Sequence, residues 1–139
     1  MAGAMADELE NSWEPEEIPD EDELYMRIYK DFFLPDGTVA PGAFRDQGGG
    51  MSTNWSRYSD PQTTRQGSPR HPPEAYGVIS MSVGKVRNIP DQIVQHSPDW
   101  ANNNRAHTDV IGNKKTIGVR ERFVECSNIR IRIDPNQLP

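Results

Sequence analysis

Side chains that could carry acid–base chemistry gather in two short stretches of the chain. The stretch GGGMST ends on Ser52 and Thr53, and the stretch NNNRAHTDVIG contains His107 and Asp109. Hydroxyl, imidazole and carboxylate groups on loops are the groups that enzymes use for proton transfer and phosphate recognition. Together with an arginine in an apolar segment, they define a candidate catalytic set of Arg27, Ser52, His107 and Asp109.

A metal centre is a second chemistry to weigh. His96, His107 and Asp109 would meet if the segments 92–97 and 107–111 pair as strands. Two histidines and one carboxylate are the ligand set of a facial iron triad or a catalytic zinc site. Histidines at strand ends more often form hydrogen bonds within the protein, so we expect no metal and assign no cofactor.

The chain lacks the local motifs of the common nucleophilic and nucleotide-binding folds. It contains no Gly-x-Ser-x-Gly elbow, no Walker loop and no Gly-x-Gly-x-x-Gly turn between a strand and a helix. The glycine run at 48–50 precedes an extended segment, so no helix aims its amides at a phosphate. The single cysteine, Cys126, excludes an internal disulfide and is expected to pack in a helix.

Two segments resemble the arrangement found in ADP-ribosyltransferases. Arg27 lies in the strand-like LYMRI, and Ser52 and Thr53 open the later strand-like GMSTNW. In that family, an arginine and a Ser-Thr segment hold NAD, so the resemblance implies group transfer from a nucleotide. The family's catalytic glutamate has no counterpart, because Glu121 and Glu125 fall in a predicted helix. The residues also allow an inward-turned Arg27 paired with a carboxylate.

The elements that would position these residues can be placed by hydrophobic periodicity. Extended segments are predicted at 24–29, 51–55, 76–89, 91–97, 107–112 and 128–133, and helices shortly after Ser59 and at 114–126, the second capped by Asn113. In the last strand, Ile129, Ile131 and Ile133 would face inward. This pattern predicts an α+β domain over 23–139 with a curved, mainly antiparallel sheet of five or six strands and one or two helices.

An acidic leader precedes this domain. Residues 7–23 hold ten acidic and no basic side chains, and the remaining 11 acidic and 15 basic side chains leave the rest of the chain at +4. Such a leader, over 1–22, is expected to be disordered unless Trp13 or Ile18 anchors it to the body or to a partner. The first four residues are interpreted as an expression remnant and excluded from the fold.

A basic face is predicted near the C-terminal end of the chain. The members of this face are Arg120, Arg122, Arg130 and Arg132, and Arg105 is a further candidate binding residue outside it. They could neutralise phosphates of a nucleic acid, although no aromatic side chains are interleaved to stack on bases. They would equally suit an acidic protein partner or the leader itself, and exposed arginines also protect sheet edges.

Composition limits the function further. A chain of 139 residues with 34% hydrophobic content, 12 prolines and 11 glycines supports one small core and few helices. No apolar run reaches the ~18 to 20 residues of a membrane span, and no signal peptide is recognised, so we expect a cytoplasmic protein.

Two functions remain. The first is an accessory or regulatory protein that binds a macromolecule, a protein more readily than a nucleic acid, through the basic face and the leader. The alternative is an enzyme acting on a nucleotide or NAD-like substrate. An enzyme should bring the candidate catalytic side chains together in one concave pocket, whereas a binding module should leave them scattered.

Overall fold

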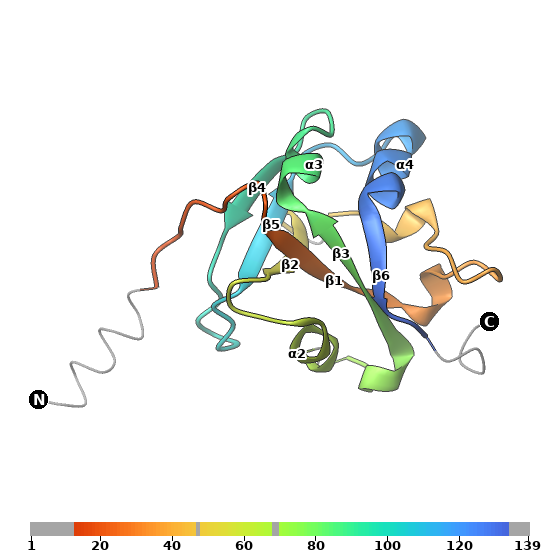
Figure 1. Ribbon diagram of the computed structural model, residues 1–139, viewed down its shortest axis with the longest axis horizontal. Coiled ribbons are helices and arrows are strands. Elements are labelled where there is room, and N and C mark those ends of the chain that lie inside the picture. Colours follow the sequence, from red (N-terminus) through yellow and green to blue (C-terminus); the bar gives the residue numbers. More distant parts are fainter. Residues whose placement is uncertain (1–12, 47, 68–69, 134–139) are drawn as a thin grey trace, which may run out of the picture.

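A computed structural model describes residues 13–46, 48–67 and 70–133 (Figure 1). Within these ranges the strands are β1 (Glu23–Tyr29), β2 (Met51–Trp55), β3 (Tyr76–Ser82), β4 (Ile93–His96), β5 (His107–Ile111) and β6 (Ser127–Ile131). The α-helices are α2 (Pro61–Gln66), α3 (Val83–Arg87) and α4 (Ile117–Cys126), and short 3-10 turns are η1 (Lys30–Phe32), η2 (Pro41–Ala43) and η3 (Pro73–Ala75).

The described strands form one six-stranded sheet. Its order is β4-β5-β2-β1-β3-β6, and every neighbouring pair is antiparallel. Because the sheet is open and helices pack against it, the predicted α+β class and antiparallel sheet are confirmed.

One face of the sheet carries the hydrophobic core. Leu24, Met26 and Ile28 alternate along β1 and are buried, as their spacing predicts. The rings of Phe44 and Phe123 stack in the same cluster, with centroids 5.3 Å apart. Residues of α3 and α4 complete this layer, and Figure 1 shows α2 on the opposite side of the sheet.

The opposite face is polar, and strand register brings its side chains into rows. Tyr25 lies opposite Asn54, and Asn54 lies opposite His107. Side chains two residues apart on a strand share a face, so Arg27 and Ser52 belong to the same surface. Asp109 lies directly opposite Ser52, so strand pairing gathers all four candidate catalytic residues on one side of the sheet.

A third helix replaces the end of a predicted strand. The extended segment expected at 76–89 stops at Ser82, and α3 follows at once. The amide of Val83 donates to the Asp22 carbonyl and that of Gly84 donates to the Asp20 carbonyl. Carbonyl groups of the chain before β1 thus accept hydrogen bonds from the first amides of α3. Val83 and Val86 of this helix are buried in the core.

The other helices begin later than the sequence predicts. Asp60, not Ser59, caps α2, and its carboxylate accepts a hydrogen bond from the Thr63 amide at 2.8 Å. Thr116, not Asn113, caps α4. In each case the cap is the polar residue directly before the first helical residue, where its oxygen reaches a free amide.

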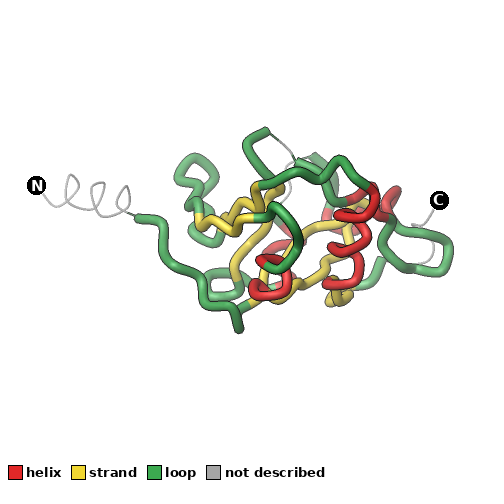
Figure 2. The backbone as a smooth tube through the Cα atoms, turned by 90° about the horizontal axis from the view of Figure 1, so that it is seen from above, coloured by secondary structure: helices red, strands yellow, loops and turns green. Residues whose placement is uncertain are grey.

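The described part of the leader packs on the body rather than standing free of it. Ile18 is 2% exposed, and Trp13 stacks on Trp100 with ring centroids 3.8 Å apart. Both predicted anchors therefore make contacts. Figure 2 shows the described chain before the first strand as a loop along one end of the molecule, and Figure 1 places that segment away from α4.

For residues 13–22 the position predicted for the leader is wrong, and residues 1–12 lie outside the described ranges. The leader was expected to cover Arg120 to Arg132, but Glu16 forms ion pairs with Arg57 and Arg105, while Arg87 pairs with acids at 17 and 20. Burial of Ile18 decides this placement, because one buried apolar side chain contributes about 1.5–3 kcal/mol and an exposed ion pair at most about 1 kcal/mol.

Candidate functional site

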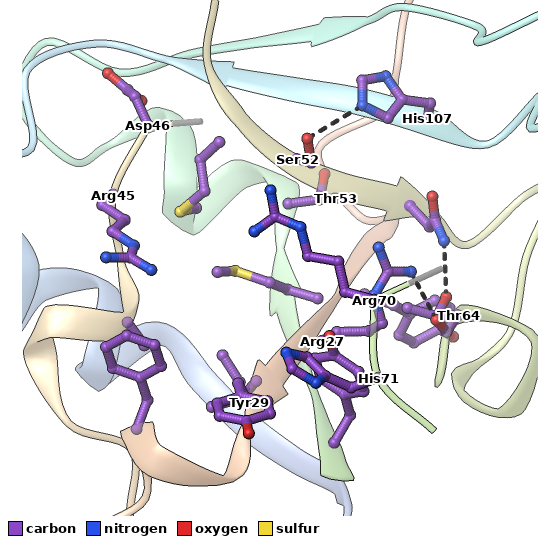
Figure 3. Close-up of a pocket in the computed structure, with 18 of the residues that line it drawn as sticks. Arg27, Tyr29, Arg45, Asp46, Ser52, Thr53, Thr64, Arg70, His71 and His107 are labelled. Carbon is purple, nitrogen blue, oxygen red and sulfur yellow. Dashed lines mark hydrogen bonds between the residues drawn. The ribbon is translucent and has the colours of Figure 1, made fainter. Parts of the chain in front are cut away.

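A cavity of about 600 Å³ opens on the polar face of the sheet (Figure 3). Three of the four candidate catalytic residues, Arg27, Ser52 and His107, line it. Asp109 lies beside His107 but does not line the cavity. The volume of the cavity falls within the range of small-molecule sites.

Four segments surround this sheet face. Thr64 of α2 closes one side, followed by Arg70 and His71 from the loop before β3. Another side is closed by Phe32, Arg45 and neighbouring residues. A separate wall is formed by Asn104 of the asparagine-rich loop. Strands therefore form the floor, and loops from distant parts of the sequence form the walls.

Arg27 is a half-buried cation without an acidic partner. Its Nη1 atom donates to the Thr64 carbonyl at 2.8 Å, and no carboxylate of the described residues forms an ion pair with it. Burial lowers the pKa of Arg27, but an arginine stays protonated at neutral pH. Among the described residues, Arg27 therefore does not form the carboxylate pair of the alternative interpretation, and its guanidinium lines the cavity.

Further basic groups surround Arg27. Arg45 lies over the Phe32 ring, 5.0 Å from its centroid, and the His71 ring lies 4.5 Å from that of Tyr29. Arg70 also lines the cavity. The sequence analysis missed these three basic side chains, because they lie in proline-containing loops without periodicity.

Asp46 is the single acidic side chain in the described lining, and it is neutralised. It forms an ion pair with Lys114, which is 3% exposed and also donates to two backbone carbonyls. Arg27 and Arg45 therefore give the cavity a positive potential, which favours an anionic ligand.

Ser52 and His107 form a hydrogen-bonded pair at the cavity wall. The Ser52 Oγ atom lies 3.3 Å from the His107 Nε2 atom. The His107 Nδ1 atom lies 2.9 Å from the Ser97 carbonyl oxygen, which can only accept a hydrogen bond. In the neutral ring, Nδ1 therefore carries the hydrogen, and the Nε2 lone pair faces Ser52.

Asp109 lies beside this pair, on the Nε2 side of the His107 ring. Its carboxylate accepts a hydrogen bond from the Ser97 hydroxyl at 2.8 Å, and its second oxygen lies 3.9 Å from His107 Nε2. The side chain of His107 is 22% exposed, so it is accessible from the cavity as expected for the first residue of β5.

The second histidine of the sequence analysis has a structural role. His96 is buried, its Nδ1 accepts from the Glu16 amide, and its Nε2 lies 2.7 Å from the Arg105 carbonyl. Both ring nitrogens are thus occupied by backbone groups. No group of three or more potential metal ligands is placed to hold an ion in the described part of the chain.

The predicted basic face lies outside the cavity. Arg120 donates to the Lys114 carbonyl, and Arg130 pairs with Glu23. Arg122 and Arg132 are exposed. Binding of a macromolecule through these arginines stays a prediction.

No family model, curated protein or solved structure matches this chain. Among the described residues, no helix has the length and apolar character needed to cross a membrane. The geometry of the cavity is consequently the basis for any functional conclusion.

Proposed function

We propose that this protein is an enzyme that binds a phosphate-bearing small molecule, a nucleotide or an NAD-like compound, in the cavity on the polar sheet face. The observation that carries this proposal is Arg27, a half-buried cation with no acidic partner among the described residues. A phosphate group would supply the missing charge and accept hydrogen bonds from the planar guanidinium.

Two further features favour a nucleotide over a simple anion. Tyr29, His71 and Phe32 bring aromatic rings to the cavity wall, where a base can stack. Asn54 and Asn104 supply amide groups on the same lining, joined by a hydrogen bond of 2.8 Å. Asparagine amides can both donate to and accept from the polar edge of a base.

The ADP-ribosyltransferase resemblance supports only part of this proposal. Arg27, Ser52 and Thr53 all line the cavity, as a nucleotide-holding role requires. The described lining contains no glutamate, and Glu121 and Glu125 lie on α4. We therefore retain a nucleotide-like ligand and do not propose transfer of ADP-ribose.

Titration calorimetry with NAD, ATP and AMP tests the proposal. We expect binding to the full chain, and about 10- to 100-fold weaker binding to Arg27→Gln, because a charge-assisted hydrogen bond contributes about 1.5–3 kcal/mol. Arg122→Gln is the matched control, since Arg122 is exposed on α4. Equal affinities of the two variants, or no binding of these ligands by the unmodified chain, would contradict the proposal.

A further inference from the structure

We infer that Ser52 is a nucleophile activated by His107, and that the reaction transfers a phosphoryl group from a phosphate ester first to Ser52 and then to water. This inference rests on the proposed function, because the cations of the cavity are what bring a phosphate to Ser52. It adds the reaction class and the roles of individual residues.

The geometry of the pair matches that of a nucleophile and its base. The separation of 3.3 Å between Ser52 Oγ and His107 Nε2 is in the looser range expected before a substrate binds. The Ser97 carbonyl fixes the ring so that its free nitrogen faces Ser52. A base oriented by a third group is the arrangement that activates serine in nucleophilic enzymes.

The strands hold this pair rigidly. Ser52 lies directly opposite Asp109 in the β2–β5 ladder, and His107 lies opposite Asn54. Ser52 and His107 are therefore diagonal neighbours on one face of an antiparallel pair, a separation that long side chains can bridge. Groups fixed on strands keep their relative geometry better than groups on loops.

Other aliphatic hydroxyls of the described lining are occupied elsewhere. Thr53 is buried and donates to the Thr108 carbonyl at 2.9 Å. Thr64 is also buried, and its hydroxyl is bonded to Asn54 and Ser59. Ser52 is thus the aliphatic hydroxyl of this lining that contacts a base.

The reaction proceeds in two displacements. In the first, Ser52 Oγ forms a bond to phosphorus, the bond from phosphorus to the leaving oxygen breaks, and the Ser52 proton moves to His107 Nε2. His107 then gives this proton to the leaving oxygen, which departs as an alcohol. In the second, His107 takes a proton from water, the water oxygen bonds to phosphorus, and the bond from phosphorus to Ser52 Oγ breaks. His107 gives its proton to Ser52 Oγ, which releases phosphate and restores both the hydroxyl and the neutral imidazole.

Asp109 and Ser97 are positioning residues in this scheme. The Asp109 carboxylate lies 3.9 Å from His107 Nε2 and favours the imidazolium that forms when His107 accepts the proton. The Ser97 hydroxyl holds that carboxylate at 2.8 Å. Cations beside the reacting phosphate would stabilise the charge on its oxygens.

A fluorophosphonate probe tests the inference on the full chain. The Ser52 oxygen displaces fluoride from phosphorus and its proton passes to His107, which leaves a stable adduct that peptide mass spectrometry locates. We expect one adduct, on Ser52, and none in Ser52→Ala. His107→Gln should react at least about 100-fold more slowly, the usual loss when a general base is removed. Ser82→Ala, outside the cavity, should react like the unmodified chain.

Asp109→Asn provides the test of positioning. We expect it to slow the probe reaction by about tenfold while leaving the calorimetric nucleotide affinity unchanged. Nitrogen NMR of the His107 ring should show hydrogen on Nδ1 in the unmodified chain and in this variant. A ring that carries its hydrogen on Nε2 would overturn the assigned role of His107 as the base.

The two proposals fail in different ways. Arginine-dependent nucleotide binding without an adduct on Ser52, or equal reaction rates of His107→Gln and the unmodified chain, would overturn the Ser52–His107 inference and leave the proposed function standing. An adduct on Ser52 without nucleotide binding would refute the proposed function. The substrate of the Ser52–His107 pair would then be a phosphate ester other than a nucleotide.

Discussion

His96 and His107 have the same side chain and opposite situations. The ring of His96 is buried, and backbone groups of the leader and of the loop before β5 occupy both of its nitrogens. Only one nitrogen of His107 is held by the backbone, and the other meets a hydroxyl at the cavity wall. A group that is oriented but not fully satisfied is available for chemistry, which is why the candidate site contains His107 alone of the two.

Tyr58 couples the leader to pH. Its hydroxyl donates to the Glu16 carboxylate, and this hydrogen bond is the main reason that the pKa of Tyr58 is raised. Because the folded-state pKa lies above the unfolded value of about 10, this contact is fully present below about pH 10 and is lost as pH rises through the folded-state pKa. We expect Glu16→Gln to lower the pH at which Tyr58 ionises.

Proton NMR of the tyrosine rings during an alkaline titration measures this effect. Tyr58→Phe identifies the resonance and serves as the control. A Tyr58 midpoint that is the same in Glu16→Gln and in the unmodified chain would show that the carboxylate does not hold the hydroxyl.

Residue patterns predict part of the site and miss the rest for a physical reason. The two-residue period of a strand fixes the face on which Arg27, Ser52 and His107 lie once their strands are recognised. Arg70 and His71 come from a loop whose path depends on packing between distant segments. Such tertiary placement leaves no periodic trace in the sequence.

At the scale of elements, local sequence patterns predicted the strands better than the helices. All six strands were predicted because each carries a local alternation or a run of β-branched residues. The helix α3 was not predicted, because its first amides donate to the carbonyls of Asp20 and Asp22, more than 60 residues earlier in the chain. Ile117 at the start of α4 is 62% exposed, and Phe123 is the buried residue of that helix.

Replacing a glycine by alanine should have opposite effects on stability at two positions in different elements. A Cβ atom at Gly77 of β3 would lie 2.6 Å from the Phe33 ring and 2.9 Å from the Ile131 carbonyl oxygen. A Cβ atom at Gly118 of α4 would meet nothing within 4 Å. We expect Gly77→Ala to destabilise the protein by about 1–3 kcal/mol, and Gly118→Ala to stabilise it by up to about 1 kcal/mol.

Urea denaturation of the two variants and the unmodified chain measures both values, and each variant is the control for the other. Equal stabilities of the two variants would mean that β3 and β6 do not approach as closely as this packing requires.

At the scale of the whole molecule, charge is partly neutralised within the chain. The leader brings Glu16, Glu17 and Asp20 to arginines at 57, 87 and 105, none of which belongs to the predicted basic face on α4 and β6. Arginines that would otherwise attract an anionic surface are thus occupied by acids from the same chain. Removing those acids should therefore expose a basic surface that the sequence analysis had placed elsewhere.

The triple variant Glu16→Gln, Glu17→Gln, Asp20→Asn tests this prediction while keeping Ile18 as the buried anchor. We expect it to bind heparin more tightly than the unmodified chain at low salt, with the difference shrinking as the Debye length falls to about 8 Å at physiological ionic strength. The matched control neutralises Glu74, Glu121 and Glu125, which are exposed acids elsewhere, and so gives the same net charge. If only total charge matters, the two triple variants will elute from a heparin column at the same salt concentration. Later elution of the leader variant would instead locate the effect at Arg57, Arg87 and Arg105.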